Sequence, residues 1–465
     1  MMKGATTWSY APYKPFFFDR GDIYVCRLAP DERSFHCEWL AAPGPEYELM
    51  LRPEGEGEFA CAARVTVPEA TVEGLKEETD YEFYVRCGGK KSRVRLFRTG
   101  RPVGTVVNYL HPRDDEYAFS GRYLCSPSLV RHPDGYLLAS MDLFAGGAPQ
   151  NLSLIFRSDD DGRTWHYLTD LFPCFWGKLF IHRGELYMLA CSTEYGDLLI
   201  GKSADGGRTF GAPTALLRGS CKCGVAGVHK NPQPVIEHRG RLYETLEWGS
   251  WGEGYHAAMV MSADVESDLL DPASWRFTPP VKYDPAWPGV ASGPSSGNIE
   301  GSLVVSPDGA LFNIMRYDMT KCRPNYGRVL AYRVDTDDPD APLAYDHAVE
   351  LPGNHSKFMI KRDERTGLYF TIISRILDGE GVMNRNLLSL MVSKDLRRWE
   401  LAADLIDRRH EDPRGTGFQY VDWMIEGEDL LYLCRTAMNQ PHNYHDANYQ
   451  TFHRLAGFRD LLNGF

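Results

Sequence analysis

Charged side chains recur at one position after a series of glycine-containing turns. The residue seven places after the turn glycine is Asp142, Cys191, Glu247 or Arg316 in four successive segments, and Arg375 and Arg435 stand near the equivalent place in two later ones. Carboxylates exchange protons with a reacting group, and arginines bind anions through paired N–H donors. The pattern therefore predicts acid–base chemistry on a ligand that could carry a negative charge.

A second polar group stands at the start of the same apolar segments. It comprises Lys178, His229, Glu300, His355, Lys357, Tyr420 and Asp422, with Trp176 and Trp423 as aromatic neighbours that could stack on a flat ligand face. If each segment is an antiparallel strand pair, the start of its first strand and the end of its second share one edge. We therefore expect both groups to line one face of the molecule.

A loop near the C-terminus holds further candidates. The run PHNYHDANY contains His445 next to Asp446. A histidine could act as acid or base while a carboxylate holds its tautomer, which is the function we expect for His445. Two alternatives stay open: a metal site, although a third ligand is not evident, or a polar loop whose side chains bond their own backbone.

The elements that position these residues are indicated by a repeated phrase. Ser158, Asp160, Gly162, Thr164 and Trp165 follow the spacing S-x-D-x-G-x-T-[WF], which recurs from Ser203 to Phe210. Asp folds back onto turn amides, Gly adopts a positive φ, and the aromatic residue packs between sheets. Weaker copies are Ser393, Asp395 and Trp399, and Ser262, Asp271 and Trp275. A turn that recurs every 40 to 50 residues or so predicts four-stranded blades.

Residues 104–465 are therefore expected to form a β-propeller. Six segments align on inner turns that contain Gly135, Gly184, Gly240, Gly309, Gly367 and Gly427. Thr105 to Leu110 is expected to supply the outer strand that closes the ring with the last segment. Six blades are predicted, or seven if the insertion from Pro279 to Gly297 hides strands.

Residues 15–100 predict a separate β-sandwich. Short strands with alternating polarity are separated by turns that contain Gly or Pro. Trp39, Leu75 and Tyr81 resemble the packing and corner residues of a fibronectin type III domain. The fold class predicted for the whole chain is all-β, with this sandwich before the propeller.

Composition limits the partners. The 465 residues are 43% hydrophobic and carry a formal net charge of −12, which argues against nucleic acid or an anionic membrane surface as a partner. The N-terminus has no apolar run of signal-peptide length, so a cytoplasmic location is expected unless a signal was removed. Eleven scattered cysteines favour reduced thiols over a disulfide framework. No metal or cofactor is predicted, and the oligomeric state is left open.

The turn phrase resembles the Asp-box, or BNR repeat, of the sialidase superfamily, which implies a propeller that handles carbohydrate. Long stretches from Ser126, His229, Ile299 and Gly417 are similar to a branch that includes propeller rhamnosidases and uronate lyases. This chain departs from that branch at Met141, Val228 and Glu244, where the branch often has His, Tyr and Arg. It also has Leu124-Cys125-Ser126-Pro127 where sialidases have Arg-Ile-Pro, which argues against sialidase activity proper.

Three functions follow from the residues and the resemblance together. The leading hypothesis is an exo-acting glycosidase on a terminal acidic or deoxy sugar, with Glu247 and Glu300 as the carboxylate pair and Asp142 and Asp422 in reserve. Arg316 and Arg435 would bind the substrate, and His229 would orient it or exchange protons. The alternatives are a uronate-directed lyase that uses His229 or His445 as the base, and a carbohydrate-binding propeller without catalysis.

Overall fold

The fold is almost entirely β-structure. The computed structural model describes residues 6–8, 10, 19–41, 44–222, 224–353, 356–377, 381, 383–462 and 465. Within these residues the only helices are two short 3₁₀ turns, η1 (Pro272–Ser274) and η2 (Phe458–Leu462). Among the same residues no helix has the length and apolar character needed to cross a membrane.

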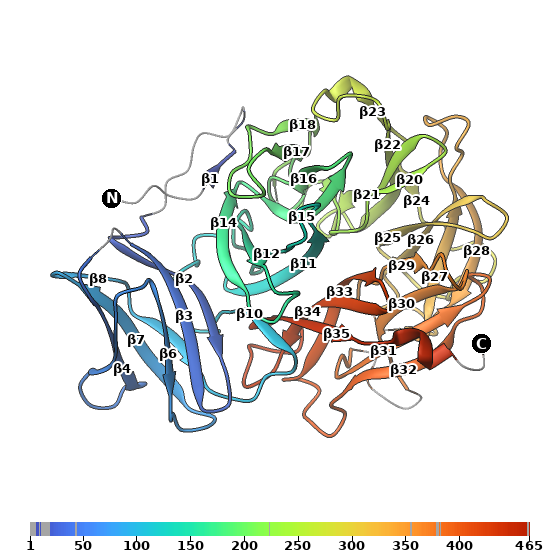
Figure 1. Cartoon of the computed structure of the whole chain (residues 1–465). Coiled ribbons are helices and arrows are strands. Elements are labelled where there is room, and N and C mark those ends of the chain that lie inside the picture. The colour runs from blue at the N-terminus through green and yellow to red at the C-terminus, as the bar shows by residue number, and fades with distance from the viewer. Residues whose placement is uncertain are drawn as a thin grey trace.

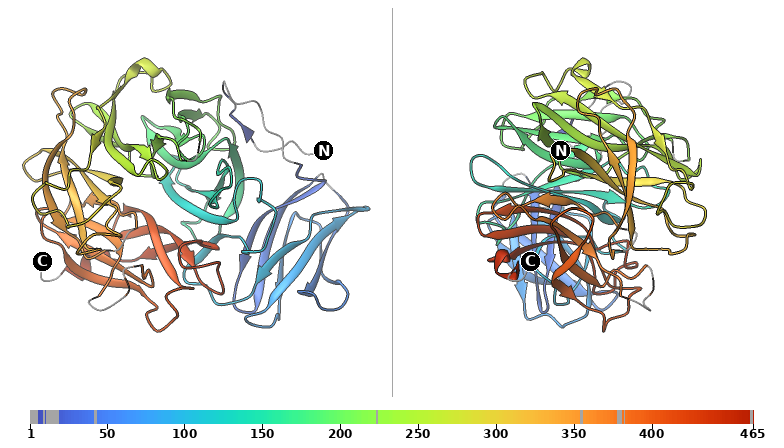
Figure 2. Two further views of the ribbon diagram at one scale, coloured as in Figure 1. Left: turned by 180° about the vertical axis from the view of Figure 1, so that it is seen from behind. Right: turned by 90° about the vertical axis from the view of Figure 1, so that its right-hand side faces the viewer.

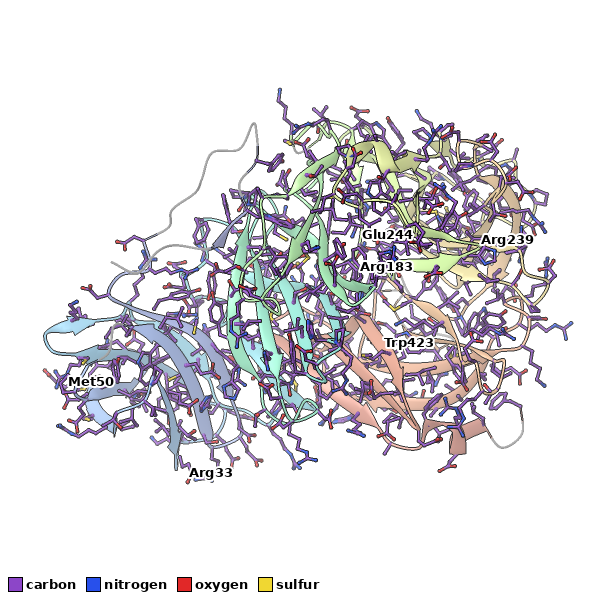
Figure 3. All side chains as sticks on the ribbon, turned by 45° about the horizontal axis from the view of Figure 1, so that its top comes forward. Arg33, Met50, Arg183, Arg239, Glu244 and Trp423 are labelled. Atoms are coloured by element: carbon purple, nitrogen blue, oxygen red, sulfur yellow. The ribbon has the colours of Figure 1, made fainter. Side chains whose placement is uncertain are left out.

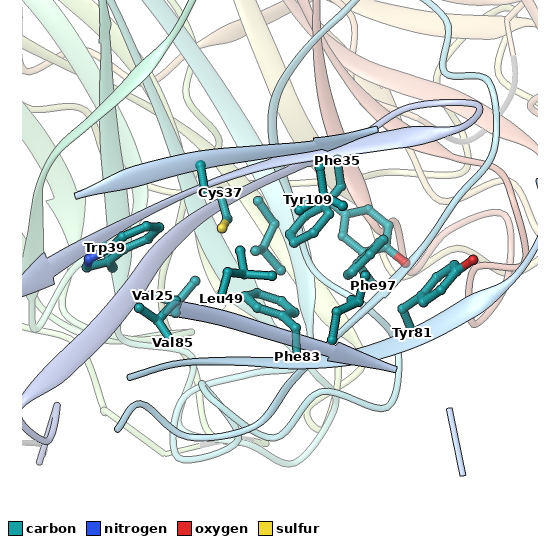
Figure 4. Close-up of a cluster of buried hydrophobic side chains, with 14 of the residues drawn as sticks. Val25, Phe35, Cys37, Trp39, Leu49, Tyr81, Phe83, Val85, Phe97 and Tyr109 are labelled. Atoms are coloured by element: carbon teal, nitrogen blue, oxygen red, sulfur yellow. The ribbon is translucent and has the colours of Figure 1, made fainter. Parts of the chain in front are cut away.

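The N-terminal part consists of two facing sheets. One has the order β2-β3-β6, and the other has β5-β4-β7-β8 with β9 paired to β7. The bounds are β2 (Ile23–Pro30), β3 (Ser34–Ala41), β4 (Tyr47–Pro53), β5 (Ala60–Val65), β6 (Glu69–Glu73), β7 (Asp80–Cys87), β8 (Lys90–Lys91) and β9 (Arg95–Arg98). Figure 4 shows the core between the sheets, where the ring of Phe35 stacks on that of Phe97 at 3.9 Å. This arrangement is compatible with the predicted fibronectin type III-like sandwich.

Six further sheets follow one another around a common centre, as Figures 1 and 2 show. The first three contain β11 (Tyr123–Arg131), β12 (Leu137–Phe144), β13 (Ser153–Ser158) and β14 (His166–Phe172); β15 (Phe175–His182), β16 (Glu185–Cys191), β17 (Leu198–Ser203) and β18 (Thr214–Leu217); and β19 (Gly227–His229), β20 (Ile236–His238), β21 (Arg241–Ser250), β22 (Tyr255–Asp264), β23 (Trp275–Phe277) and β24 (Val281–Lys282). Strand β1 (Thr6–Thr7) adds to the first of these sheets by pairing with β14.

The other three sheets continue the same meander. They contain β25 (Asn298–Val305), β26 (Leu311–Tyr317), β27 (Arg328–Arg333) and β28 (Ala344–Glu350); β29 (Ile360–Arg362), β30 (Tyr369–Ser374), β31 (Leu387–Ser393) and β32 (Glu400–Asp407); and β33 (Gly417–Glu426), β34 (Asp429–Ala437), β35 (Tyr449–Leu455) and β10 (Thr105–Tyr109). The chain thus forms the predicted β-propeller, and the sheets are compatible with six blades. The insertion that could have hidden a seventh contributes β24, which pairs with β22 of the third sheet.

The ring closes as predicted. Strand β10 pairs antiparallel with β35, so the last sheet combines an early segment of the chain with a late one. This pairing covers the outer edge of β35, which would otherwise expose unpaired backbone groups. Thr105 lies opposite Phe452, and Tyr109 lies opposite Tyr449.

The sandwich is joined to the ring by buried charges. Arg27 on β2 donates to the backbone oxygens of Val106 and Val107, at 3.0 and 2.9 Å, and to Glu38 at 2.9 Å. Glu38 in turn accepts from the backbone N–H of Tyr167 on β14, at 3.0 Å. Sandwich, closing strand and first blade therefore share one hydrogen-bond network.

The repeated turns have the hydrogen bonds that the sequence predicts. In the first, Asp160 accepts from the backbone N–H of Thr164 at 2.9 Å and from its hydroxyl at 2.7 Å. Gly162 has a φ of 87°, and Trp165 is fully buried. The turn from Ser203 repeats these bonds through Asp205 and Thr209 at 2.8 and 2.6 Å.

The two weaker copies keep less of this pattern. Ser393 lies 3.3 Å from Asp395, which accepts from the backbone N–H of Arg397 at 2.9 Å. Asp271 instead caps η1 through the N–H of Ala273, at 3.0 Å, and Trp275 alone keeps its buried place between blades. The first two turns therefore keep more of the predicted hydrogen bonds than the last two turns do.

Candidate functional site

Four inner strands share a backbone irregularity that aims side chains toward the centre of the ring. Ser126, Trp176, Glu300 and Tyr420 have φ values of 50°, 53°, 60° and 56°, although none is glycine. Each lies in β11, β15, β25 or β33 at the point where the register with the neighbouring strand shifts. Such bulges re-aim a side chain at the cost of backbone strain, and they gather at functional sites. Three of the four residues are among those predicted from the sequence.

Glu247 and His229 form a buried pair. They face each other across β21 and β19, and Glu247 Oε2 lies 2.7 Å from His229 Nδ1. Burial, followed by the nearby charge of Glu300, raises the pKa of Glu247 well above its usual value. Burial lowers the pKa of His229 to about 4. Both shifts favour the form in which the Glu247 carboxyl group holds the proton and the His229 imidazole is neutral.

Glu300 lies beside this pair in the opposite electrostatic setting. Its Oε2 forms an ion pair with Nη1 of Arg316 at 2.6 Å, and the backbone N–H of Gly301 reaches Glu247 Oε1 at 3.3 Å. Burial opposes the charge of Arg316, but Glu300, Tyr420 and Asp318 together outweigh it and raise the pKa of that guanidinium. The site thus places a carboxyl group bonded to a histidine beside one paired with an arginine, and such different surroundings suit acid–base chemistry on one bond.

Three arginines surround Tyr420. Arg316 donates to the Tyr420 hydroxyl at 3.2 Å. The guanidinium carbons of Arg435 and Arg385 lie 5.0 and 5.7 Å from the centre of its ring. Arg385 also donates to Gln419, and burial lowers its pKa to about 10, so it stays charged at neutral pH. This cationic face can bind a carboxylate or another anionic group.

Asp142 supports the site from below. It is fully buried; Oδ2 accepts from the backbone N–H of Trp176 at 2.6 Å, and Oδ1 accepts from Ser153. Burial raises the pKa of Asp142 to about 7. Because both oxygens bond the protein, Asp142 holds the bulge of Trp176 in place. Trp176 in turn packs edge-on against His229, with ring centres 4.5 Å apart.

The C-terminal loop reaches the arginine face. His445 Nδ1 lies 2.8 Å from Asp446, as the sequence predicts, and Arg435 donates to the His445 backbone oxygen at 2.5 Å. Burial, followed by the charge of Arg435, lowers the pKa of His445 to about 3. A neutral His445 stands 6.4 Å from the Tyr420 ring, at the edge of the site.

Several predicted charges lie inside the ring beneath the site. Lys178 forms an ion pair with Asp422, and both side chains are almost fully buried. Lys357 is 1% exposed and donates to the backbone oxygen of Pro232 at 2.9 Å; burial lowers its pKa to about 7. Beneath the site, therefore, these three side chains contact protein groups.

A second buried ion pair joins Lys230, which follows the predicted His229, to Glu244. Lys230 and Glu244 form an ion pair at 3.1 Å, and both side chains are fully buried. Glu244 is one of the positions at which the chain departs from the resembled branch. Figure 3 places it among the strands of the propeller, on a different blade from Trp423.

Two predicted residues, Arg375 and Trp423, are not brought to the site. Arg375 turns to the outer strand β32, where it bonds Asp404 at 2.7 Å. Trp423 is fully buried and donates to the backbone oxygen of Met359 at 3.1 Å, inside the core between blades. His355 lies outside the described residues.

Metal-binding groups gather elsewhere. Among the described residues, the cluster of side chains that could hold an ion is His36, Glu38 and Glu69, on the sandwich. At the mouth of the ring, Glu247 and Glu300 are engaged with a histidine and an arginine instead. The predicted absence of a metal stays a prediction.

Sequence reasoning missed several residues of the site. Arg385 follows no strand pattern, because it lies in a loop between β30 and β31. His256 and Tyr195 flank His229, with ring centres 5.1 and 6.0 Å from it. Lys230 follows the predicted His229 directly in the sequence.

Comparison with known proteins gives likenesses in fold alone. No protein-family model matches the chain, and no curated protein sequence does. An α-L-arabinanase of Penicillium chrysogenum complexed with arabinobiose has a TM-score of 0.49 and 14% identity over 76% of this chain and 99% of that one. A leech intramolecular trans-sialidase has a TM-score of 0.48 and 9% identity over 96% and 93%. The NanB sialidase of Streptococcus pneumoniae, as a point mutant, has a TM-score of 0.47 and 9% identity over 94% and 93%.

Proposed function

We propose that the protein is a glycoside hydrolase that removes a terminal acidic sugar from an oligosaccharide. The observation that carries this proposal is the presence, in one buried patch, of Glu247, bonded to His229, and Glu300, which forms an ion pair with Arg316. Burial raises the pKa of Glu247, which favours its function as the proton donor. Glycoside cleavage needs a proton donor for the leaving oxygen and a second group for the anomeric carbon. The two carboxyl groups have environments that separate these roles.

The proton can reach the leaving group through His229. Its Nδ1 is bonded to Glu247, which leaves Nε2 as the ring nitrogen that can face a ligand. As the glycosidic C–O bond breaks, Nε2–H protonates the departing oxygen and Glu247 passes its own proton to Nδ1. His229 stays neutral throughout, which its lowered pKa favours. Glu300 acts at the anomeric carbon, directly or through a water molecule.

The burial of the site and its positive charges favour an acidic sugar at the end of an oligosaccharide. Glu247, His229 and Glu300 are 1%, 5% and 5% exposed, so an internal sugar of a long chain would reach them poorly. Arginines 316, 385 and 435 offer a cationic face beside Glu300. A carboxylate on the terminal sugar would bind there by charge-assisted hydrogen bonds.

A uronate lyase is the second candidate, because a neutral His229 could also accept a proton next to a carboxylate held by the arginines. The test is incubation with oligosaccharides that end in uronate, sialic acid or rhamnose, followed by mass and ultraviolet absorbance. Hydrolysis adds water and leaves no new absorbance, whereas elimination creates a conjugated double bond that absorbs. Binding without any product would favour a carbohydrate-binding propeller. The absence of both binding and product would refute the proposal.

A further inference from the structure

The hairpin that joins β21 to β22 carries an exposed tryptophan next to the site. Trp251 is 49% exposed, more than any other tryptophan of the described residues. Val225, 44% exposed, lies in the adjoining loop, which the hairpin tip contacts through a bond from the N–H of Ala226 to Glu253 at 2.9 Å. An exposed apolar patch beside a polar site indicates a surface that a ligand covers.

The position of Trp251 is fixed by buried groups. Its backbone N–H donates to the hydroxyl of Tyr195 at 3.1 Å, and that hydroxyl lies 3.2 Å from Nε2 of His256. Its ring stands edge-on to His256, with ring centres 4.6 Å apart. Tyr195 and His256 are both fully buried, so the indole is supported from beneath while much of its surface stays free.

The same histidine connects this patch to the proton donor. The ring of His256 lies 5.1 Å from that of His229, which bonds Glu247. From Glu247 the contacts continue to the backbone N–H of Gly301, next to Glu300, and from Glu300 to Arg316 of the arginine face. A ligand whose terminal sugar occupies the arginine face and whose glycosidic oxygen meets His229 therefore extends its next sugar toward Trp251.

We propose that Trp251, with Val225, is the binding site for the sugar that leaves. This inference rests on the proposed hydrolase function and adds the chemistry of the second sugar. The C–H face of a neutral sugar ring packs well on an indole, whose face is electron-rich. Burial lowers the pKa of His256 to about 3, so the support beneath the indole is uncharged at neutral pH. The substrate is therefore an acidic sugar joined to a neutral sugar.

The test compares two probes on a slowed enzyme. Glu247→Gln serves as the background, because an amide of the same shape replaces a carboxyl group that is neutral in the fold and can still bond His229. The probes are a disaccharide of glucuronic acid linked to a neutral hexose, and the methyl glycoside of glucuronic acid. In this background, Trp251→Ala is expected to lower the affinity for the disaccharide about tenfold in calorimetric titrations. The affinity for the methyl glycoside should stay unchanged.

Two further variants guard the result. Trp251→Phe should restore most of the lost affinity, because it keeps an aromatic face, and Leu401→Ala, at a side chain 41% exposed on β32, should change neither probe. An unchanged affinity ratio between the two probes in Trp251→Ala would overturn the leaving-sugar site alone. If the Glu247→Gln protein binds neither glucuronide nor the corresponding sialic acid probes, the hydrolase proposal falls, and this site with it.

Discussion

Two regions of the propeller adopt the same backbone conformation with opposite kinds of residue. The outer turns place glycine at positive φ, at Gly162 and Gly207, whereas the inner bulges place Glu300 and Tyr420 there. A side chain in this conformation is strained, and glycine avoids the strain. In the turns the chain only has to change direction, and glycine can do this without strain. In the bulges the side chains of Glu300 and Tyr420 are themselves part of the site, so glycine cannot replace them and the strain remains.

The largest expected effect separates activity from stability. Glu300→Gln should lower turnover about a thousandfold or more, because the amide cannot act at the anomeric carbon as a carboxylate does. Asp160→Ala, in the first turn, should leave kcat unchanged and lower the melting temperature, because it removes the bonds to Thr164. Steady-state kinetics and thermal unfolding on both proteins test this. Near-normal turnover of a folded Glu300→Gln protein would remove Glu300 from its role.

The turn glycines offer the next test. Gly162→Ala should lower the free energy of unfolding by about 2–4 kcal/mol, because φ is 87° and the new Cβ would overlap the ring of Phe452. Gly135→Ala is the matched control, since φ is 94° but no atom lies within 4 Å of the new Cβ. It should cost only about 1 kcal/mol in chemical denaturation. Equal losses would show that the packing of Phe452 contributes nothing.

Replacing the two buried lysines Lys357 and Lys230 should change the free energy of unfolding in opposite directions. Lys357→Met should stabilise the fold by about 1–3 kcal/mol, because it removes a buried ammonium that donates to the backbone oxygen of Pro232. Lys230→Met should destabilise it by about 3–5 kcal/mol, because it leaves Glu244 buried without its partner. Denaturation with urea measures both. Destabilisation by Lys357→Met would contradict the first assignment.

The effect of Lys357 should depend on pH in a defined direction. Its pKa is about 7 in the fold against 10.5 in the unfolded chain, so the unfolded state binds more protons between these values. Stability of the wild type should therefore rise with pH across this window through Lys357. The advantage of Lys357→Met should be full below pH 7 and vanish above 10.5. Parallel unfolding curves at pH 6 and 9 check the trend.

The smallest effect tests the bulge directly. At position 300, Gly should be more stable than Ala by about 1 kcal/mol, because only the positive φ distinguishes them. At position 247, in regular strand β21, the order should reverse by about 0.5–1 kcal/mol. Four variants and their unfolding free energies suffice. The same order at both positions would mean that the bulge at Glu300 carries no strain.

Much of the fold could be predicted from the sequence because its signals are local. Alternating apolar residues mark the strands, glycines mark the inner turns, and the phrase around Asp160 specifies its own hydrogen bonds. The closing strand was predictable too, because residues 105–110 form an apolar run that is left over once the six segments are aligned. In the structure this run pairs with β35. These features depend on side chains close together in the chain.

The site was predictable only in part. Glu247 was found because its spacing from the turn glycine repeats, and Glu300 and His229 because they stand at the starts of apolar segments. The positive φ of Trp176, Glu300 and Tyr420 was not, because these residue types avoid it and only the surrounding fold imposes it. Arg385 has no periodic neighbours, and Arg375 was misjudged because its partner Asp404 lies on a distant strand. Long-range pairing leaves no local signature.

The closing pair of strands has a consequence for how the molecule is made. During synthesis β10 emerges well before its partner β35. Throughout that interval its apolar edge would be open to the wrong neighbour. Arg27 already holds the backbone oxygens of Val106 and Val107 from within the finished sandwich. The N-terminal sandwich can therefore hold β10 in place until β35 is synthesised and pairs with it.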